Sequence, residues 1–459
     1  MKKFNVGVIT SIHPRSDARI NIKTTNSLSN NFNASLIVFD GLGDDVTGKF
    51  PIYDAKKFGK ISLQTNFFKS YFSFILSFFH QIILMIKLLK SKFSYEIIDL
   101  FISFVIKPIR LTINYFLFIK HYCHKFFKNL IRGRIDAFFL GILLSPLIIT
   151  LRIIMFSSTI PRSYYINKVA RTLNLDVVHL HDPELIFLGL YLKLKGMHVI
   201  YDSHEDFPKQ ILGKNYLFNS QLNNYFVKIL APSARLFFYI ILRHFSGVIA
   251  ATPSIRNSLI KINPNCIVIN NYPVLSDIEF TSFDKKKKSA LYIGNVHEAK
   301  GSFDYENASK FVHRSIVFDI VGRYRMPLYF SNNLKYHGLK SRNELNYFFR
   351  NSFVGLCVFH PIPNYIEAQP IKLYEYMAAG RPVIVSNFPL WEKFIRENNC
   401  GIVVPPHNPR AIAEAVEKLY YDQKLASRLG VNGRRAVEAK YNWSLEEVKL
   451  IAFYNKILN

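Results

Sequence analysis

Two carboxylates, Glu367 and Glu375, stand on either side of a predicted helix start at Pro370 in this 459-residue chain. A proline suits that position because the first helical turn does not need its N–H. The N-terminus of a helix attracts phosphate, and a carboxylate can accept hydrogen bonds from neighbouring hydroxyl groups. The arrangement therefore suits a nucleotide sugar, which carries a diphosphate between two sugars. A pair of solvated helix glutamates is the alternative that the bare spacing leaves open.

The surrounding sequence predicts the elements that hold these glutamates. The apolar run 354–359 is typical of a buried parallel strand, and residues 360–364 should form the loop that follows it. The helix from Pro370 should end before Gly380, and residues 382–385 predict the next strand. These elements form a βαβ unit whose loop lies at the carboxyl edge of the sheet, where open α/β folds bind ligands.

The Glu-x7-Glu spacing is followed by Tyr-Met-Ala-Ala-Gly-x-Pro-Val-Ile at residues 376–384 and by Gly-Ile-Val-Val-Pro at residues 401–405. This ordered set resembles the donor-binding half of a family 4 retaining glycosyltransferase with the GT-B fold, of the kind encoded for bacterial surface-polysaccharide assembly. The resemblance implies an α/β protein with two Rossmann-like domains that face each other across a cleft. It also implies that Glu367 contacts the transferred sugar and Glu375 the nucleotide ribose.

The length of the chain allows two domains, each with its own core. We expect an N-terminal acceptor domain at 1–283, a nucleotide-sugar-binding domain at 284–440, and a terminal helix at 441–459 that, in this fold, crosses back to the first domain. The lysine run 285–288 indicates a solvated linker at the domain boundary. Capping residues predict three helix starts, at Ser341-x-x-Glu344, at Asn408 and at Ser444-x-x-Glu447.

The composition is strongly basic and aromatic, with 59 Lys plus Arg against 32 Asp plus Glu, a formal net charge of +27 and 15% aromatic residues. The four cysteines are scattered, which indicates reduced thiols and argues against a disulfide framework or a zinc site. The sequence holds no zinc-finger spacing, RNP-like strand or helix-turn-helix pattern, so we expect no nucleic-acid partner. An anionic membrane surface accounts for the cations and the aromatic side chains together.

The basic and aromatic residues are concentrated in a block at about 66–165. Its apolar runs approach the roughly 20 residues that a spanning helix needs, but lysines or Pro146 interrupt them. We interpret the block as an insertion in the first domain, made of amphipathic helices that lie in the membrane interface on the cytoplasmic face of the inner membrane. A spanning hairpin and a helical layer buried between the domains are the alternatives.

The loop after the first predicted strand, residues 6–9, gathers His13, Asp17 and Arg19 at a carboxyl strand end. The loop resembles the opening loop of a subgroup of family 4 enzymes, in which this edge faces the cleft. An ordinary turn with a salt link explains the same residues, and the sequence leaves both interpretations open.

His204 follows the predicted strand 198–201. A lone histidine is more often structural than catalytic. The resemblance, however, implies that His204 faces the donor sugar and the acceptor. It implies that His181, together with His179, shapes the site.

The second domain begins with a predicted strand that ends at Gly294, and the loop after it matches the diphosphate-binding loop of the family. Lys300 takes the place of the family's lysine. Asn295 stands where the family places an arginine, and the spacing is one residue shorter, so a bidentate phosphate ligand is missing. We predict Arg323 as a substitute, and the resemblance implies that Leu339 lies where family members hold the nucleotide base.

These candidates predict a metal-independent transfer that retains the anomeric configuration. Lys300 and the helix N-terminus at Pro370 and Ile371 would stabilise the departing diphosphate in place of a divalent ion. Glu367 would hold the sugar hydroxyls, and His204 would bond near the reacting carbon. The resemblance implies front-face attack assisted by the leaving phosphate. We expect no cofactor apart from the nucleotide-sugar co-substrate, UDP- or GDP-linked.

The basic and aromatic block makes a polyprenyl-linked saccharide the predicted acceptor. Three alternatives stay open. A nucleotide-sugar epimerase with the GT-B fold would use the same donor half without a lipid acceptor. A catalytically silent membrane-associated relative would need no intact glutamate pair. A nucleic-acid binder would show salt-sensitive binding to nucleic acid and no affinity for anionic vesicles.

Overall fold

The structure, a computed structural model, describes residues 3–60, 159–204, 235–236, 238–282, 288–323 and 333–459. These residues form two compact units. The first comprises the described chain up to Ser203 and the stretch that ends at Val248, and the second comprises His204 and the chain from Ile249 onward. The strands form a seven-stranded sheet in the first part of the chain and a six-stranded sheet in the last part.

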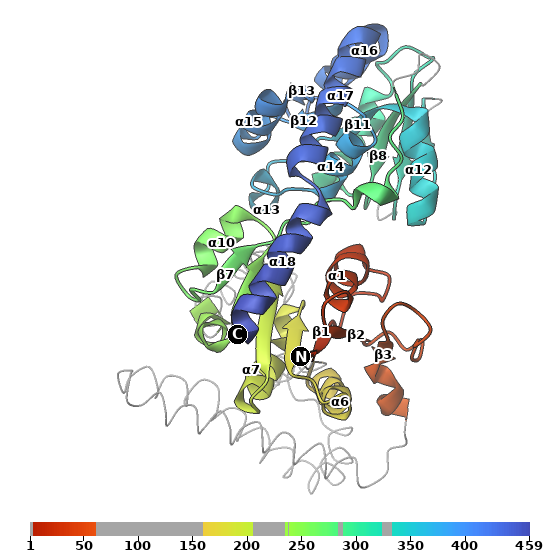
Figure 1. Cartoon of the computed structure of the whole chain (residues 1–459). Helices are drawn as coiled ribbons and strands as arrows, with labels where there is room; N and C mark the ends of the chain where they lie inside the picture. The colour runs from red at the N-terminus through yellow and green to blue at the C-terminus, as the bar shows by residue number, and fades with distance from the viewer. Residues whose placement is uncertain (1–2, 61–158, 205–234, 237, 283–287, 324–332) are drawn as a thin grey trace, which may run out of the picture. The chain divides into compact units, whose positions relative to one another are not determined.

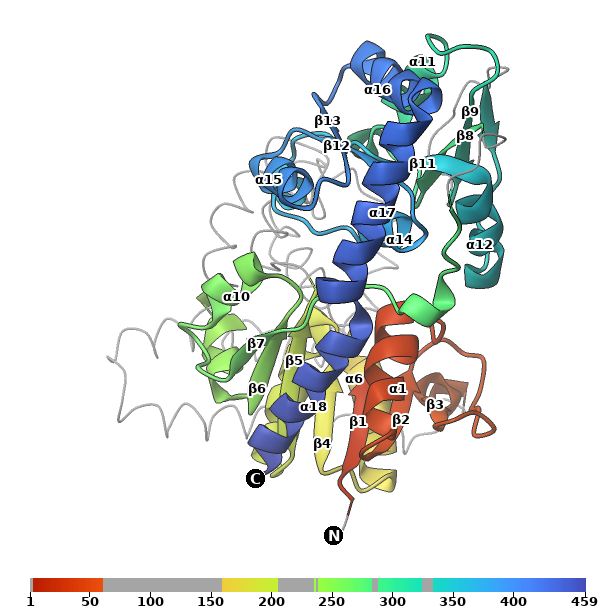
Figure 2. The same cartoon turned by 45° about the horizontal axis from the view of Figure 1, so that its top comes forward.

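The seven-stranded sheet has the strand order β3-β2-β1-β4-β5-β6-β7, and the pairings among β1 to β5 are parallel (Figure 2). Its strands are short apolar runs that are buried almost throughout, as expected for a parallel sheet covered on both faces. The strands are β1 (Asn5–Ile9), β2 (Asn33–Val38), β3 (Ile52–Asp54), β4 (Val177–Leu180), β5 (His198–Ser203), β6 (Gly247–Ala250) and β7 (Cys266–Val268). The connecting helices include the π-helix η1 (Ala18–Thr25), α1 (Asn26–Ser29), α6 (Thr159–Thr172), α7 (Ile186–Leu194) and α10 (Pro253–Leu259).

The six-stranded sheet is parallel throughout, with the order β10-β9-β8-β11-β12-β13. This is the doubly wound order of a Rossmann fold, and the strand order reverses between β8 and β11. The strands are β8 (Ser289–Ile293), β9 (Val317–Val321), β10 (Leu334–Tyr336), β11 (Ser352–Cys357), β12 (Val383–Ser386) and β13 (Gly401–Val404). The helices are α11 (Ser302–Ala308), α12 (Arg342–Asn351), α13 (Pro363–Ile366), α14 (Ile371–Ala378), α15 (Pro389–Asn398), α16 (Pro409–Tyr421), α17 (Gln423–Lys440) and α18 (Trp443–Leu458), with the 3-10 turns η6 (Leu275–Asp277) and η7 (Glu298–Lys300) (Figure 1).

The predicted βαβ unit forms as β11, α14 and β12. Pro370 is the N-cap of α14, one residue before the position expected for it. Gly380 lies just beyond the last helical turn with φ +76°, a left-handed conformation that a residue with a side chain rarely adopts. The neighbouring Arg381 is fully buried and donates to the carbonyl oxygens of Ala379 and Ser352. Gly380 and Arg381, which belong to the motif at 376–384, therefore end the helix and pack the turn that follows it.

Three local predictions about helices have clear outcomes. The capping box of Ser341 and Glu344 opens α12, and Asn408 caps α16 through Ala411 N–H, as expected. The loop at 360–364 was expected to be irregular throughout, but the short helix α13 begins at Pro363. The prediction that Ser444 caps the terminal helix is wrong. Asn442 is the cap, because Trp443 already occupies the first helical position and its N–H donates to the Pro273 carbonyl oxygen at 2.9 Å.

The basic and aromatic block lies outside the described residues, apart from residues 159–165, which belong to α6. Its assignment as membrane-associating helices therefore stays a prediction. Within the ranges that the structure describes, no helix combines the length and the apolar character needed to cross a bilayer.

Candidate functional site

The carboxyl edge of the six-stranded sheet brings together the loops that follow β8, β9, β10 and β11. The Gly294 N–H donates to the Val321 carbonyl oxygen at 2.8 Å, and the His360 N–H donates to the Ala299 carbonyl oxygen at 3.0 Å. Gly322 packs so closely that an added Cβ would lie 1.9 Å from the Gly294 oxygen. This edge includes the point at which the strand order reverses, which is where doubly wound sheets bind ligands.

Two lysines lie at this edge beside the same aromatic ring. The Lys372 Nζ atom is 5.2 Å from the Phe359 ring centroid, and the Lys300 Nζ atom is 6.0 Å from it. The Lys372 Nζ atom also sits over the face of Tyr292, 3.8 Å from its ring centroid. A Cβ on Gly294 would come within 2.6 Å of the Lys372 Nζ atom, so a side chain at this position would displace the lysine.

Burial sets the electrostatics of this cluster. Lys372 is 8% exposed, and burial is the largest cause that lowers its pKa to about 7. The positive charge of Lys300 lowers the Lys372 pKa further, while Cys357 and Glu375 act in the opposite direction. Burial also raises the pKa of the Cys357 thiol to about 12, so this cysteine is a neutral packing group and no nucleophile.

Glu375 is on the buried side of α14 and is 6% exposed. Its Oε1 atom accepts a hydrogen bond from Arg342 Nη1 at 2.9 Å, and Arg342 Nε pairs with Asp277 at 3.2 Å. A buried carboxylate held by a guanidinium is fixed in direction, which suits a residue that must meet a ligand hydroxyl in one orientation. Arg342 is therefore a positioning residue that the sequence did not reveal.

Glu367 ends α13 and is exposed. Within the second unit its Oε2 atom accepts a hydrogen bond from Ser254 Oγ at 2.6 Å. Glu367 and Glu375 thus differ strongly in environment: the first is on the surface of a loop, and the second is buried against an arginine. This is the asymmetry expected if the first glutamate must meet a group that enters and leaves.

The remaining donor candidates also lie on these loops. The exposed Asn295 accepts a hydrogen bond from Tyr292 Oη at 2.9 Å through its backbone carbonyl oxygen. The exposed Arg323 accepts from Val296 N–H through its backbone at 2.9 Å, which links it to the loop of Asn295. Leu339, after β10, is 70% exposed, so its side chain is accessible to a ligand, although other apolar side chains of this chain are exposed to a similar degree. The structure thus places all the predicted donor residues on one sheet edge or on α14.

The candidate loop after β1 forms a charged cluster within the first unit. His13 contacts Asp17 at 3.3 Å and Asp182 at 3.4 Å. Asp182 is fully buried and accepts from Thr10 Oγ1 at 2.8 Å. The hydrogen bond to Asp17 is the largest cause that raises the His13 pKa, which burial partly offsets. Asp17 also caps η1, so the loop is held by the salt link that the plainer interpretation predicted.

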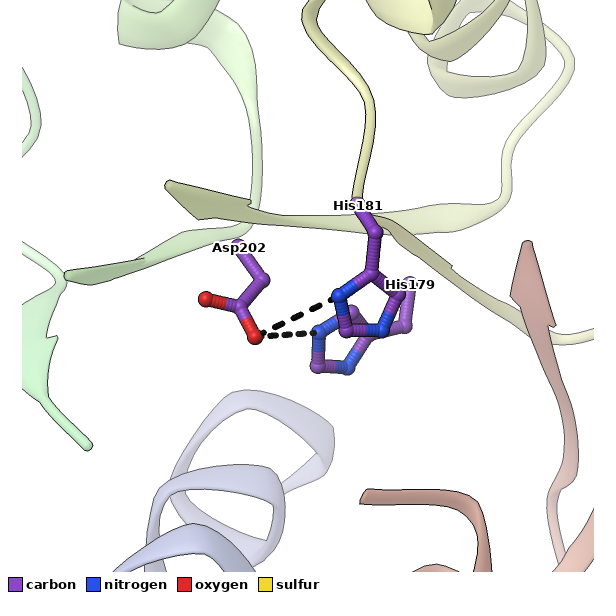
Figure 3. A group of neighbouring side chains, drawn as sticks. All are labelled: His179, His181 and Asp202. Atoms are coloured by element: carbon purple, nitrogen blue, oxygen red, sulfur yellow. Dashed lines mark ion pairs between the residues drawn. The ribbon is translucent and has the colours of Figure 1, made fainter. Parts of the chain in front are cut away.

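Arg19 and His181 belong to a second, fully buried group. Arg19 pairs with Asp202 in a bidentate manner, Nη2 to Oδ1 at 2.7 Å and Nε to Oδ2 at 3.1 Å. His179 and His181 stack with ring centroids 4.6 Å apart, and both point at Asp202, at 3.6 Å and 3.5 Å (Figure 3). His204 follows β5 directly and is half-buried, and its catalytic role stays a prediction.

Two groups of side chains in the described part of the chain could hold a metal ion. The first is His179, His181 and Asp202, but the guanidinium of Arg19 already provides the positive charge that this carboxylate needs. The second is Asp304, His360 and His407, in which His360 Nε2 lies 2.8 Å from the Asp304 carboxylate. The expectation of a metal-independent reaction stays a prediction.

The structure adds two candidate residues that are not among the sequence-based candidates, Lys372 and Arg342. Lys372 lies inside the quoted glutamate motif, so the motif gave a signal, but a lysine in the first turn of a helix usually points to solvent. Asp202 also follows the predicted strand 198–201 directly, and this position could have marked it as a candidate. Arg342 gave no signal, because only the packing of α12 beside α14 brings it to Glu375.

Comparisons with known proteins agree with this picture. Residues 276–436 match the family model described as glycosyl transferases group 1, and residues 145–271 match the model described as glycosyltransferase family 4. Among curated relatives, alpha-D-kanosaminyltransferase from Streptomyces kanamyceticus is 28% identical over 36% of this chain and 45% of its own length. The capsular polysaccharide biosynthesis glycosyltransferase CapM from Staphylococcus aureus is 32% identical over 20% of this chain and 22% of its own length.

Solved structures have a similar fold. Sucrose-phosphate synthase from Thermosynechococcus elongatus aligns with a TM-score of 0.62 over 99% of both chains, at 13% identity. A glycosyltransferase from Rickettsia africae aligns with a TM-score of 0.54 over the full length of both, at 12% identity. The curated relatives named above are matched over less than half of their length. The predicted likeness to family 4 glycosyltransferases, with two parallel-sheet α/β domains of the GT-B type, is confirmed at this level.

Proposed function

On the premise of this family 4 likeness, we propose that the protein is a retaining glycosyltransferase that moves a sugar from a nucleotide sugar to a lipid-linked saccharide. The observation that carries the proposal is the cluster at the edge of the six-stranded sheet. There Lys300 and Lys372 lie beside one aromatic ring, next to a glycine loop and the N-terminus of α14. Lysine side chains, a glycine backbone and a helix N-terminus all favour the binding of phosphate.

The proposed reaction breaks the bond between the anomeric carbon and the diphosphate and forms one to an acceptor hydroxyl. Lys300 and the start of α14 stabilise the negative charge that develops on the departing diphosphate. The acceptor proton passes to a phosphate oxygen of the leaving group, so no protein nucleophile is required. Glu367 accepts hydrogen bonds from the sugar, Glu375 binds the ribose, and His204 bonds near the reacting carbon.

The acceptor and the cellular site are further parts of the proposal. The formal charge of +27 and the basic and aromatic block favour an anionic membrane surface, at which a polyprenyl-linked acceptor would be presented. CapM, by its name, acts in capsular polysaccharide biosynthesis. A second relative, 31% identical over 20% of this chain and 24% of its own length, is the phosphatidyl-myo-inositol mannosyltransferase of Mycobacterium leprae. The first name supports a role in polysaccharide assembly, and the second supports a lipid acceptor. The cytoplasmic face of the inner membrane as the site of action is part of our proposal.

The test is a transfer assay with membranes that contain the protein. Labelled UDP-, GDP- and dTDP-sugars are supplied together with lipid-linked acceptors, and the anomeric configuration of the product is determined. We expect transfer of label to the lipid fraction with retention. A lack of transfer from every donor, or an epimerised nucleotide sugar formed without an acceptor, contradicts the proposal.

The matched variants are Glu367→Ala and Glu397→Ala. Glu367→Ala should lower the transfer rate by about 100-fold or more, because a charged hydrogen-bond acceptor for the sugar is lost at the reacting end. Glu397 is an exposed residue of α15 that pairs only weakly with Lys393, so its removal should leave the rate unchanged. Equal rates in the two variants would remove Glu367 from the mechanism.

A further inference from the structure

Lys372 is buried in a way that packing alone does not require. It is the second residue of α14, it is 8% exposed, and its Nζ atom has no hydrogen-bond acceptor among the residues that the structure describes. An ammonium group carries three N–H donors, and leaving them unmatched in the interior is unfavourable. A methionine would fill a similar volume without this cost, so the amine has a role that the unliganded fold does not show.

The aromatic neighbours compensate the charge of Lys372 only in part. The face of Tyr292 attracts the ammonium at 3.8 Å, and Phe359 lies at 5.2 Å. Aromatic faces attract a cation but leave most of its N–H groups without oxygen acceptors. The Lys372 amine therefore keeps N–H groups that only an oxygen acceptor would satisfy.

The titratable groups around the Lys372 amine come from every element packed against it. They are Tyr292 on β8, Lys300 in η7, Cys357 at the end of β11 and Glu375 on α14. Burial lowers the pKa of Lys372 to about 7, and Lys300 adds to this effect. Glu375 is engaged by Arg342, so its charge is already balanced. At neutral pH the amine is consequently poised between its neutral and charged forms.

A glycine backbone packs directly against the Lys372 amine. Gly294 is the residue nearest to it in the loop that leads to Lys300, and an added Cβ there would lie 2.6 Å from Nζ. The φ of Gly294 is +136°, so the chain holds a conformation that excludes other residues at this point. The amine thus has the Gly294 backbone against it and a second cation, Lys300, beside the same Phe359 ring, and an anion with oxygen acceptors is the ligand whose chemistry matches both cations.

We propose that Lys372 is a conditional ligand of the donor diphosphate: its neutral amine takes up a proton from solvent as the diphosphate enters, and the ammonium then donates hydrogen bonds to a phosphate oxygen. The inference rests on the proposed donor site and adds a second cation to it, together with a coupling between donor binding and protonation. Donor affinity is then expected to fall as the pH rises above neutrality, because each bound diphosphate must bring one proton to Lys372.

The experiment is calorimetric titration of the full chain with UDP and with GDP, in pairs of buffers that differ in ionisation enthalpy. The secondary phosphate ionisation of a nucleotide, with a pKa of about 6, is complete at pH 8, so it does not contribute protons there. The wild-type protein should take up close to one proton per ligand at about pH 8, and its affinity should fall by up to about 10-fold per pH unit above neutrality.

Two variants complete the test. Lys372→Met should bind about 10- to 100-fold more weakly at pH 7, because charged hydrogen bonds are lost, and should show no proton uptake. Lys393→Met removes an exposed lysine of α15 and should behave like the wild type. Diphosphate binding without proton uptake, or an unchanged affinity in Lys372→Met, overturns the role of Lys372 but leaves the donor site standing. If the wild type binds neither UDP nor GDP, the donor site and this inference both fail.

Discussion

The carboxyl edges of the two sheets both carry buried charged side chains, but these are paired at the edge of the seven-stranded sheet and partly unpaired at the edge of the six-stranded sheet. At the seven-stranded sheet, Asp202 is matched by Arg19 and two histidines, and Asp182 by hydroxyl groups and His13. At the six-stranded sheet, two lysines lie close together, and the described residues offer Lys372 Nζ no hydrogen-bond acceptor.

This difference distinguishes charged side chains that stabilise the fold from charged side chains that can bind a ligand. A buried ion pair with good geometry is costly to break, and it fixes the direction of the groups around it. A buried cation without a counter-ion lowers the stability of the unliganded protein and gains its partner on binding. The charged groups at the edge of the seven-stranded sheet are therefore already paired. The edge of the six-stranded sheet is complementary to an anion that the chain does not itself supply.

Breaking the ion pair of Arg19 and Asp202 at the edge of the seven-stranded sheet should have the largest effect on stability. Asp202→Asn leaves the Arg19 guanidinium buried without a countercharge, which should lower the free energy of unfolding by about 3–5 kcal/mol. Urea denaturation measures this effect. The control Glu397→Gln alters an exposed carboxylate of α15 and should change the value by less than about 0.5 kcal/mol. If both variants lowered the free energy of unfolding by similar amounts, the ion pair of Arg19 and Asp202 would contribute no more to stability than an exposed carboxylate.

Removing Lys372, whose Nζ atom has no hydrogen-bond acceptor within the described part of the chain, should raise the free energy of unfolding instead of lowering it. The folded-state pKa of Lys372, about 7, lies below the unfolded value, so the unfolded chain binds the extra proton between these values and the wild-type stability rises with pH across that window. Lys372→Met removes this penalty and should raise the free energy of unfolding at pH 7 by roughly 2–4 kcal/mol. Denaturation curves from neutral to alkaline pH test it, and a destabilised variant with the wild-type pH slope contradicts it.

A side chain at Gly294 should disturb the carboxyl edge of the six-stranded sheet without removing any of its charged groups. Gly294→Ala forces a non-glycine residue to φ +136° and brings a methyl group to 2.6 Å from Lys372 Nζ. We expect a loss of about 1–3 kcal/mol in stability, together with weaker binding of UDP or GDP. Gly43→Ala also substitutes a glycine with positive φ, but one with open space around it, and should lose stability without losing affinity. Unchanged nucleotide binding in Gly294→Ala would separate this glycine from the site.

The smallest effect is expected at His13, which is about a third exposed. Asp17 raises the His13 pKa, so the charged imidazole contributes stability that is fully present below its unfolded pKa and is lost as the pH rises through the folded value. His13→Gln should therefore cost less than about 1 kcal/mol below pH 6 and nothing above the folded pKa. Unfolding measured on both sides of neutrality checks this; an equal loss at alkaline pH would point to packing instead of charge.

The sequence predicted the elements whose signals are local. The strand, helix and strand around Glu375 follow from two apolar runs, Pro370 and Gly380, and each lies within one or two residues of its expected bounds. The terminal helix shows the limit of such signals: Asn442 and Ser444 are both good caps, and the Ser444-x-x-Glu447 pattern favoured the wrong one. The burial of Trp443 and its hydrogen bond to Pro273 decide between them, and both depend on a distant part of the chain.

The donor site was predictable in its positions but not in its electrostatics. A strand end and a helix start locate Gly294, Lys300 and Glu375 on one edge once the sheet is parallel. The burial of Lys372 depends on Tyr292, which lies 80 residues earlier in the sequence, and no spacing rule connects them. The pairing of Arg19 with Asp202 spans 183 positions for the same reason.

The central claim is that the edge of the six-stranded sheet binds the diphosphate of a nucleotide sugar. The most direct measurement is a calorimetric comparison of UDP and GDP with uridine and guanosine on the wild-type protein near neutral pH. The account predicts that at least one diphosphate binds about 100-fold or more tightly than its nucleoside, by an amount that falls as salt is added. Equal affinities for diphosphate and nucleoside, or no binding of either, would contradict it.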